Sequence, residues 1–564
     1  VVLAGDSELA MRLLSTLADV AGLAGLIALT RRLTSSSAAA VFAGLLHAGS
    51  PFMLWYAQET RMYALVAALG MLSSYWLWRW LTDGDAGLPK VLASVGLLLA
   101  AVYAHYYAVF LLPAHGVLVA LALLRRRASG VRRRIVLHYA APVVSGGLLL
   151  MPWMALASVG FAYGDGFYFP PNTVSGRLME WLRSYASGGL ARELPEGWWG
   201  LLLVAAALGG IGYARARRWM HLAAALSLTV VPVLAATTAV RLLYWDRSVF
   251  HPRYLIYTVP LSLAWCAGAL TAGGRSRWLA GAAVGATLGL LWLPSSMAYL
   301  TQPALQRDDT RSAVQHVVEA LEPGDAVVMS RDNFAVRYYW RGHNWPLIAL
   351  PKGLHGILWS ESDVLQRLNA AQPHRVRLVL WQDDVVDPQR LIESTLWHNG
   401  YQLGEYNFAQ IRLPLYQLTN RPLQPLLLQP LGGRFGDALE LRAFWQRSQA
   451  LAGDWFYVVL EWLPRAPIAH DYKVFVHVRD QQGRLAFQRD KQPLSVLLPM
   501  HRWQAERPVR DPYAMVVPAD VPAGRYQVVV GVYDGETGVR LPAFHPTRSL
   551  GDALLLEVVE IAHR

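Results

Sequence analysis

Long apolar runs separated by short polar stretches fill the first 300 or so residues of the chain, and the remainder has a different pattern. A helix that crosses a bilayer needs about 20 apolar residues, within a range of about 17–25. Ten stretches approach this length, the fourth being the shortest, and they predict about ten transmembrane helices. These lie near residues 9–30, 36–55, 62–81, 89–104, 106–124, 134–154, 197–214, 219–240, 252–272 and 277–299.

Arginine-rich segments between the apolar runs predict the orientation of the helices. Cytoplasmic loops of membrane proteins carry an excess of Lys and Arg, and this bias sets the topology. If successive helices alternate in direction, every basic cluster falls on the side of Arg31-Arg32, which is therefore predicted to be cytoplasmic. The other clusters are Arg79, Arg125-Arg126-Arg127, Arg132-Arg133-Arg134, Arg215 with Arg217-Arg218, and Arg275 with Arg277.

Past Gln302 the long apolar runs give way to short alternating ones. Helical periodicity at residues 310–321, followed by short strands and helices, predicts a small α/β domain over residues 301–420. Short strands separated by turns then predict a β-sandwich domain over residues 421–564. The expected fold is therefore a polytopic α-helical membrane domain over residues 1–300 with two soluble C-terminal domains. The expected sandwich strands are 438–444, 455–462, 472–479, 484–490, 513–517, 526–533 and 554–560.

Composition narrows the functional class. The chain has 564 residues, is 54% hydrophobic and carries a formal net charge of +12. Because the positive charge lies in loops between apolar runs, it indicates membrane topology and argues against nucleic-acid binding. The single cysteine, Cys266, lies in an apolar run and permits neither a disulfide framework nor a CxxC metal site. No glycine-rich phosphate loop occurs in the soluble part, so nucleotide binding is not indicated.

Four polar segments fall on the side opposite the basic clusters. They are the 58–63 segment, the corner His105-Tyr106-Tyr107, the loop 155–196 and the segment 241–254. These segments lie far apart in the sequence, but the topology places them at one level of the membrane. Ionisable residues at the edge of the hydrocarbon are costly and usually mark a functional site.

The residue types suit a polyprenyl-phosphate sugar, whose tail lies in the bilayer and whose phosphate and sugar lie at its surface. Arg61 and Arg253 are candidates for holding the phosphate, because a guanidinium donates two parallel hydrogen bonds. Glu59 is the acidic residue most expected to contribute to catalysis, together with His251. The residues expected to contact the sugar or isoprenoid are Gln58, Tyr63, His105, Tyr106, Tyr107 and Tyr254.

Simpler structural roles are open for the same residues. Glu59 and Arg61 also fit an interfacial ion pair, and the His105 corner fits an aromatic belt at the membrane surface. Arg253 also fits an anchor for a helix end. Glu59 and His251 together could hold a divalent metal, but two ligands are too few for a site made by protein alone, and no cofactor is certain.

Three strings, in this order along the chain, resemble the bacterial family-39-like glycosyltransferases of the GT-C superfamily. That group includes relatives of the protein O-mannosyltransferases and the lipid A aminoarabinose transferase. The resemblance covers about residues 1–300. The strings are Gln58-Glu59-Thr60-Arg61-Met62-Tyr63, His105-Tyr106-Tyr107 and Pro252-Arg253-Tyr254-Leu255, preceded by Asp6-Ser7-Glu8-Leu9-Ala10-Met11-Arg12-Leu13.

The resemblance implies an enzyme of the bacterial plasma membrane that is inverting at the anomeric carbon. It implies a polyprenyl-phosphate sugar donor, an extracytoplasmic acceptor that is a protein, lipid or glycan, and C-terminal domains outside the cytoplasm. The match begins at the family's second helix, whereas the family's expected catalytic base follows its first helix. Asp6 and Glu8 match a later stretch rather than that base. The alternative is a non-catalytic membrane protein that binds or transports a polyprenyl lipid or glycan, or an inactive fragment without the catalytic acid.

Overall fold

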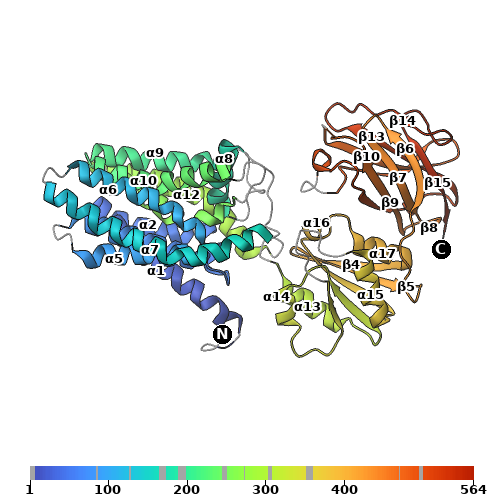
Figure 1. Ribbon diagram of the computed structural model, residues 1–564, viewed down its shortest axis with the longest axis horizontal. Helices are drawn as coiled ribbons and strands as arrows, with labels where there is room; N and C mark the ends of the chain where they lie inside the picture. The colour runs from blue at the N-terminus through green and yellow to red at the C-terminus, as the bar shows by residue number, and fades with distance from the viewer. Residues whose placement is uncertain are drawn as a thin grey trace. The chain divides into compact units, whose positions relative to one another are not determined.

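The computed structural model describes the chain in two compact units, Val1–Gln306 and Arg307–Arg564. The first unit is helical and the second is built on β-sheets (Figure 1). The described residues are 5, 7–83, 87–125, 129–163, 173–188, 199–243, 250–271, 274–302, 308–350, 360–468, 470–494 and 499–563.

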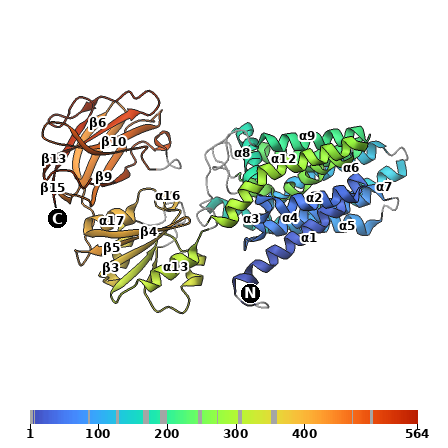
Figure 2. The same ribbon diagram turned by 180° about the vertical axis from the view of Figure 1, so that it is seen from behind.

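The helices of the first unit run roughly side by side along one direction, and helices distant in sequence are neighbours (Figure 2). α1 packs against α4, for example, and α10 against α6. The elements are α1 (Glu8–Thr34), α2 (Ser37–Gly49), α3 (Pro51–Ala57), α4 (Tyr63–Thr82), α5 (Leu88–Ala104), η1 (Tyr106–Phe110), α6 (Leu111–Arg125), α7 (Ser129–Tyr163), α8 (Val174–Ser187), α9 (Gly200–Arg215), α10 (Trp219–Leu243), η3 (Pro252–Leu255), α11 (Thr258–Cys266), η4 (Ala267–Thr271) and α12 (Gly274–Thr301).

Helices occupy the places of all ten expected spans, but several are shorter or more bent than the hydropathy pattern indicates. Within the described ranges, five helices are long and apolar enough to cross a membrane, or six if the bent pair α2 and α3 is one span. That pair bends by 66° at Ser50-Pro51, because a proline at the first helical position cannot continue the preceding helix. The segment from Pro252 to Thr271 likewise divides into η3, α11 and η4. The hydropathy pattern predicts where apolar helices lie but does not predict where they break.

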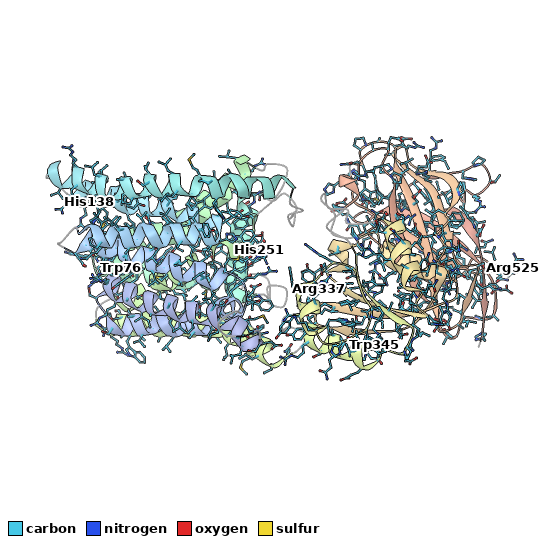
Figure 3. All side chains as sticks on the ribbon, turned by 60° about the horizontal axis from the view of Figure 1, so that its bottom comes forward. Trp76, His138, His251, Arg337, Trp345 and Arg525 are labelled. Carbon is cyan, nitrogen blue, oxygen red and sulfur yellow. The ribbon has the colours of Figure 1, made fainter. Side chains whose placement is uncertain are left out.

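Basic residues gather at one end of the helical unit. Asp83, just after α4, forms ion pairs with Arg32 at 2.7 Å, Arg79 at 3.3 Å and Lys90 at 2.9 Å. From the link between α9 and α10, Arg218 donates to the carbonyl of Leu33 at 3.2 Å. Figure 3 places Trp76 and His138, which neighbour the basic clusters in sequence, toward one end of this unit and His251 at the other. The helical unit therefore has a basic end and an opposite end that carries His251.

The second unit begins with a five-stranded mixed sheet of order β2-β1-β3-β5-β4. β1 pairs in parallel with β2 and β3, while β5 pairs antiparallel with β3 and β4. The sequence predicts much of this alternation, but it predicts a single strand over residues 402–413, where the structure has the two antiparallel strands β4 and β5. The elements are α13 (Thr310–Glu319), β1 (Asp325–Met329), α14 (Phe334–Tyr339), β2 (Leu347–Ala349), α15 (Glu361–Ala371), β3 (Arg375–Trp381), α16 (Asp383–Val386), α17 (Leu391–Asn399), β4 (Gly400–Phe408) and β5 (Ile411–Leu418).

Two further five-stranded sheets form a sandwich, with strand orders β11-β10-β13-β15-β8 and β12-β9-β7-β6-β14. Trp462 and Trp503 are buried in its core, as expected for structural aromatics. The short strands β8 and β14, and the glycine-rich β6, have little alternation and are not predicted. The elements are β6 (Gln429–Phe435), β7 (Leu439–Gln446), β8 (Gln449–Leu451), β9 (Trp455–Pro464), β10 (Tyr472–Arg479), β11 (Leu485–Lys491), η6 (Met500–Arg502), β12 (Val509–Val516), β13 (Gly524–Asp534), β14 (Ala543–Phe544) and β15 (Leu554–Ala562).

The mixed sheet and the sandwich pack together within the second unit. Tyr457 and Val459 on β9 belong to the core that also covers α15 and α17. Arg510 on β12 pairs with Glu361 on α15 at 2.9 Å. Because apolar burial and an ion pair join the mixed sheet to the sandwich, the second unit is a single compact body.

Candidate functional site

A loop between α3 and α4 carries the first group of expected site residues. Gln58 ends α3, and the N–H of Glu59 donates to the carbonyl of Tyr56 at 3.2 Å. Ser15 on α1 donates through Oγ to the carbonyl of Glu59 at 2.5 Å and lies 3.4 Å from that of Arg61. α1 therefore holds the backbone of this loop in place.

Glu59 and Arg61 face each other within the loop. Arg61 Nε lies 3.6 Å from Glu59 Oε1, so the ion pair expected as the simpler alternative is present. The two partners differ in exposure, since the Arg61 side chain is 52% exposed and that of Glu59 only 12%. The pair thus presents a guanidinium to the surroundings and keeps the carboxylate beneath it.

Two histidines cap short 3₁₀ turns in the same way. His105 Nδ1 accepts from the N–H of Tyr107 at 3.3 Å, and His251 Nδ1 accepts from the N–H of Arg253 at 3.2 Å. An Nδ1 that accepts a hydrogen bond is unprotonated, so the neutral ring carries its proton on Nε2. The two turns, η1 and η3, are also neighbours. Each histidine therefore fixes the turn that positions the aromatic and cationic residues after it.

Tyr254 is the centre of an aromatic cluster built from three distant segments. Its ring centroid lies 4.9 Å from those of His105 and Tyr107, and 5.8 Å from that of His251. Tyr63, from the start of α4, stacks on the same ring at 6.5 Å. Tyr106 stacks on His105 at 4.8 Å. The structure thus brings together the aromatic residues that the sequence places at one level of the membrane.

Arg253 lies beside two of these rings and contacts both. Its guanidinium carbon lies 5.5 Å from the ring centre of Tyr63 and 5.4 Å from that of Tyr254. Such cation–π contacts engage the faces of the rings and leave the in-plane N–H groups for other partners. The Nε of Arg253 is buried and has no hydrogen-bond partner among the described residues. A buried guanidinium donor of this kind is suited to an anion.

Helix α8 forms one wall beside this cluster. Tyr185 donates to the carbonyl of Leu255 at 2.7 Å and lies 2.5 Å from Thr258 Oγ1, which fixes the helix against η3 and α11. Its ring also contacts Phe52 on α3 at 4.9 Å. The sequence predicts a helix at residues 175–187, and the structure has it at Val174–Ser187. Asp165, Tyr168 and Phe169, from the same expected loop, lie outside the described residues.

Two charged residues of α8 are shielded from solvent. The sequence predicts Glu180 to be a solvated loop residue, but it is half-buried, and burial raises the pKa of its carboxyl to about 7 against the lowering effect of the Arg177 guanidinium. Arg177 is buried and donates to the carbonyl of Thr237 on α10 at 3.2 Å. Sequence reasoning missed Arg177. The sequence could have indicated Arg177, because it is a basic residue on the face of α8 that also carries the buried Tyr185.

The fit of a metal at Glu59 and His251 is weak. A metal on His251 Nε2 requires the ring proton at Nδ1, and this would remove the hydrogen bond from Arg253. Among the described residues, no group of three or more His, Cys, Asp and Glu is placed to hold a metal ion. The arrangement is better suited to binding an anion through arginine.

Comparisons with known proteins give distant likenesses only. No protein family and no curated protein matches the chain. ArnT from Cupriavidus metallidurans in the apo state is 14% identical, with 74% of this chain and 84% of that chain covered and a TM-score of 0.44. Arabinofuranosyltransferase AftD from Mycobacteria is 11% identical, with 98% of this chain and 56% of that chain covered and a TM-score of 0.39. The C-terminal domain of wzt is 10% identical over 30% of this chain and 84% of that chain, with a TM-score of 0.17.

Proposed function

We propose that the helical unit is a membrane glycosyltransferase of the GT-C type. It transfers a sugar from a polyprenyl-phosphate donor to an acceptor at the extracytoplasmic face of the bacterial plasma membrane. The observation that carries the proposal is Arg253, a guanidinium that contacts the rings of Tyr63 and Tyr254 and has a buried Nε that lacks a partner among the described residues. It lies at the end of the helical unit opposite the basic clusters, where a lipid-linked phosphate would reach the surface.

Phosphate is the anion that best fits this arginine. A planar guanidinium matches two phosphate oxygens, and a donor held in a water-poor site stabilises negative charge more strongly than one in water. When the bond between the anomeric carbon and the phosphate oxygen breaks, the polyprenyl phosphate leaves with that charge. Arg253 and Arg61 stabilise this leaving group. The oxygen of the acceptor hydroxyl forms the new bond to the anomeric carbon, and the proton of that hydroxyl passes to the departing phosphate.

The neighbouring residues position these two arginines and the sugar. Glu59 holds Arg61 through their ion pair, and we assign it a part in catalysis together with His251. The neutral rings of His105 and His251 carry their protons on Nε2, which suits them to donate hydrogen bonds to sugar or phosphate oxygens. Tyr106 and Tyr254 are half-buried and offer faces and hydroxyls to the sugar or isoprenoid. Tyr107 is buried in the helical core, so its part is to support the ring of Tyr254. Gln58, the residue that ends α3, completes the group.

The two ends of the helical unit support the proposed orientation in the membrane. Arg32, Arg79 and Lys90 meet at Asp83, and such basic ends face the cytoplasm in membrane proteins. The end with His251 then faces outward, and so does the second unit that follows α12. A cysteine placed at Thr60 should react with an impermeant thiol reagent in intact cells, whereas one placed at Gly130 should not. The reverse labelling pattern would contradict this orientation.

The test of the function is donor binding and transfer by three variants in membranes. Arg253→Ala should lower transfer from labelled polyprenyl-phosphate hexoses by about 10²–10³-fold, the loss typical for one stabilising donor. Arg253→Lys should recover only part, because an ammonium lacks the planar fork. Arg183→Ala is the matched control, since Arg183 is an exposed arginine on α8.

Two outcomes would contradict the assignment. Normal transfer by Arg253→Ala would reduce Arg253 to an anchor of the η3 turn. Donor binding without release of labelled sugar to any acceptor, in the unaltered protein, would favour the alternative of a non-catalytic protein that binds or transports polyprenyl lipids. Such binding without turnover is also the behaviour of an inactive fragment.

A further inference from the structure

A pocket of 340 Å³ lies in the second unit, where the mixed sheet meets the sandwich. The end of α17 and the start of β4 form one side, and the ends of β7 and β8 form the other. Its volume is at the lower end of the range of about 300–1,000 Å³ that is typical of ligand sites, which also favour junctions between domains. The position and size therefore suit a small ligand or the end of a longer one.

Aromatic and polar groups share the lining of this pocket. The rings of His398 and Trp445 meet edge to face at 5.8 Å, and Tyr401 is 41% exposed. Thr419 and Gln449 supply a hydroxyl and an amide. Flat rings beside hydroxyl and amide groups match a sugar, which has apolar C–H faces and hydroxyl edges.

Contacts between the mixed sheet and the sandwich hold the lining residues in place. Arg447, just after β7, donates to the carbonyls of Trp397 and Gly400 at the end of α17. Its guanidinium also lies 5.2 Å from the ring centre of Tyr457, on which Trp397 stacks at 4.6 Å. Thr419 donates to the carbonyl of Asn399 at 3.1 Å. A wall fixed in this way loses little conformational entropy when a ligand binds.

Charge decides between ligand classes. None of the described residues that line the pocket is acidic, and its one arginine already serves carbonyl groups. The nearby carboxylate of Glu560 accepts from the amide of the lining residue Gln449 at 3.5 Å, so the lining itself offers neither a carboxylate for a cationic ligand nor an uncommitted guanidinium for an anionic one. Gln446 also lines it, and its buried amide has no hydrogen-bond partner among the described residues. A neutral ligand rich in hydroxyl groups needs no charged partner and can form hydrogen bonds with the Gln446 amide.

We propose that this pocket is a binding site for a neutral saccharide, with Trp445 and Tyr401 contacting the faces of the sugar ring. Thr419 and Gln449 bind its hydroxyls. The site is separate from the helical unit and does not depend on the proposed transfer reaction. Binding at the pocket and transfer in the membrane are measured independently, so either proposal can fail alone.

The test uses the full chain in detergent micelles and ligand-observed NMR with three neutral trisaccharides, mannotriose, cellotriose and laminaritriose. At least one should bind, and Tyr401→Ala should weaken that binding by about tenfold through loss of an aromatic face. Tyr406→Ala is the matched control, because Tyr406 is an exposed tyrosine on the same strand that does not line the pocket. Trp445→Phe should weaken binding less than Tyr401→Ala, because it keeps an aromatic face. A circular-dichroism melt of each variant checks that it is folded.

Each remaining outcome counts against the proposal. No binding of any of the three trisaccharides at concentrations up to about 10 mM would overturn it, since useful sites bind more tightly than this. Equal binding by the Tyr401→Ala and Tyr406→Ala variants would place the saccharide elsewhere. Binding of triglucuronic acid in place of the neutral sugars would overturn the assignment of a neutral ligand.

Discussion

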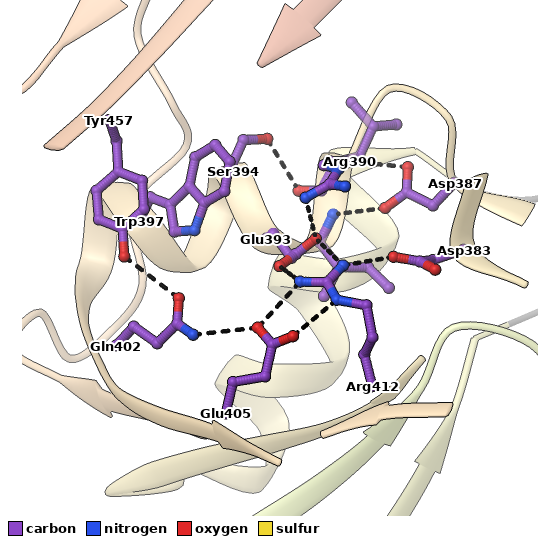
Figure 4. Close-up of polar contacts among 12 residues, drawn as sticks. Asp383, Asp387, Arg390, Glu393, Ser394, Trp397, Gln402, Glu405, Arg412 and Tyr457 are labelled. Atoms are coloured by element: carbon purple, nitrogen blue, oxygen red, sulfur yellow. Dashed lines mark hydrogen bonds and ion pairs between the residues drawn. The ribbon is translucent and has the colours of Figure 1, made fainter. Parts of the chain in front are cut away.

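Arg253 in the helical unit and Arg412 in the second unit have opposite surroundings. Arg412, on β5, pairs with Asp383 at 2.5 Å, with Glu393 at 3.1 Å and with Glu405 at 2.9 Å (Figure 4). Arg253 contacts two tyrosine rings, and the structure gives it no carboxylate within ion-pair distance among the described residues. The hydrogen-bond donors of a guanidinium surrounded by carboxylates are all used, whereas a guanidinium beside aromatic rings keeps donors for a ligand.

The difference separates a structural role from a binding role. Burying a charge without a counterion costs several kcal/mol, and proteins normally supply the partner themselves, as the second unit does for Arg412. In the helical unit we propose that the donor phosphate supplies it. The same type of substitution can therefore be made in both units. It should affect folding in the second unit and activity in the helical unit.

The largest expected effect is on the stability of the second unit. Arg412→Ala leaves three carboxylates facing one another, and we expect the free energy of opening of this region to fall by about 3–5 kcal/mol. Hydrogen exchange of the α17 and β5 peptides in the full chain measures the change. Arg442→Ala is the control, because Arg442 makes only an exposed pair with Glu461 at 3.5 Å and should change stability by no more than about 1 kcal/mol. Similar exchange in both variants would show that the network around Arg412 is not structural.

The sequence predicts the elements of both units better than it predicts these contacts. Apolar runs and alternation identify the helices and most strands, because burial of a face leaves a periodic pattern. The expected site segments also meet in the structure, since helix alternation alone puts their ends at one level. The ion pairs of Arg412 join β5 to residues of α16, α17 and β4. Such pairs cannot be predicted from the periodicity of any one segment, because the partners lie on different elements. The same limit applies to Arg177 and to the histidine caps of η1 and η3.

The second expected effect is on how the stability of the second unit depends on pH, and it involves Asp387, which lies beside the Arg412 network. Burial raises the pKa of the Asp387 carboxyl to about 7, although backbone N–H groups of Leu391 and Ile392 favour the ionised form. The unfolded group titrates near 3.9, so the folded state binds the proton more tightly between about pH 4 and 7. Stability from this group is therefore fully present below pH 4 and decreases as pH rises through 7.

Asp387→Asn removes this titration and keeps an oxygen that can accept from the start of α17. We expect opening of α17 to become less dependent on pH between 5 and 7, by up to about 1.4 kcal/mol per pH unit. Hydrogen exchange of the same peptides at pH 5 and 7, corrected for the intrinsic exchange rate, measures it. An unchanged dependence on pH would mean that Asp387 is ionised throughout this range.

The smallest effect tests the comparison directly, by changing a glutamate to glutamine beside each arginine. Glu393→Gln weakens a saturated network, so it should destabilise the second unit and leave transfer by folded protein unchanged. Glu59→Gln should do the opposite. Its amide keeps the shape but not the charge that holds Arg61, and we expect a loss of transfer of at least about tenfold, or about 1.4 kcal/mol. Melting of the helical unit should stay unchanged, because the Arg61 partner is half-exposed.

The size and rescue of the Glu59→Gln defect distinguish the roles open to this residue. A loss of less than about tenfold would make Glu59 a bystander and leave Arg253 as the main anion site. A larger loss that added Mn²⁺ or Zn²⁺ partly restores would favour a metal shared with His251, and the cap on Arg253 would then have to break. A larger loss that is indifferent to metal is the outcome we expect. It would mean that Glu59 acts through Arg61, so that the helical unit uses this carboxylate to position a cation, whereas the second unit uses three carboxylates to neutralise one arginine.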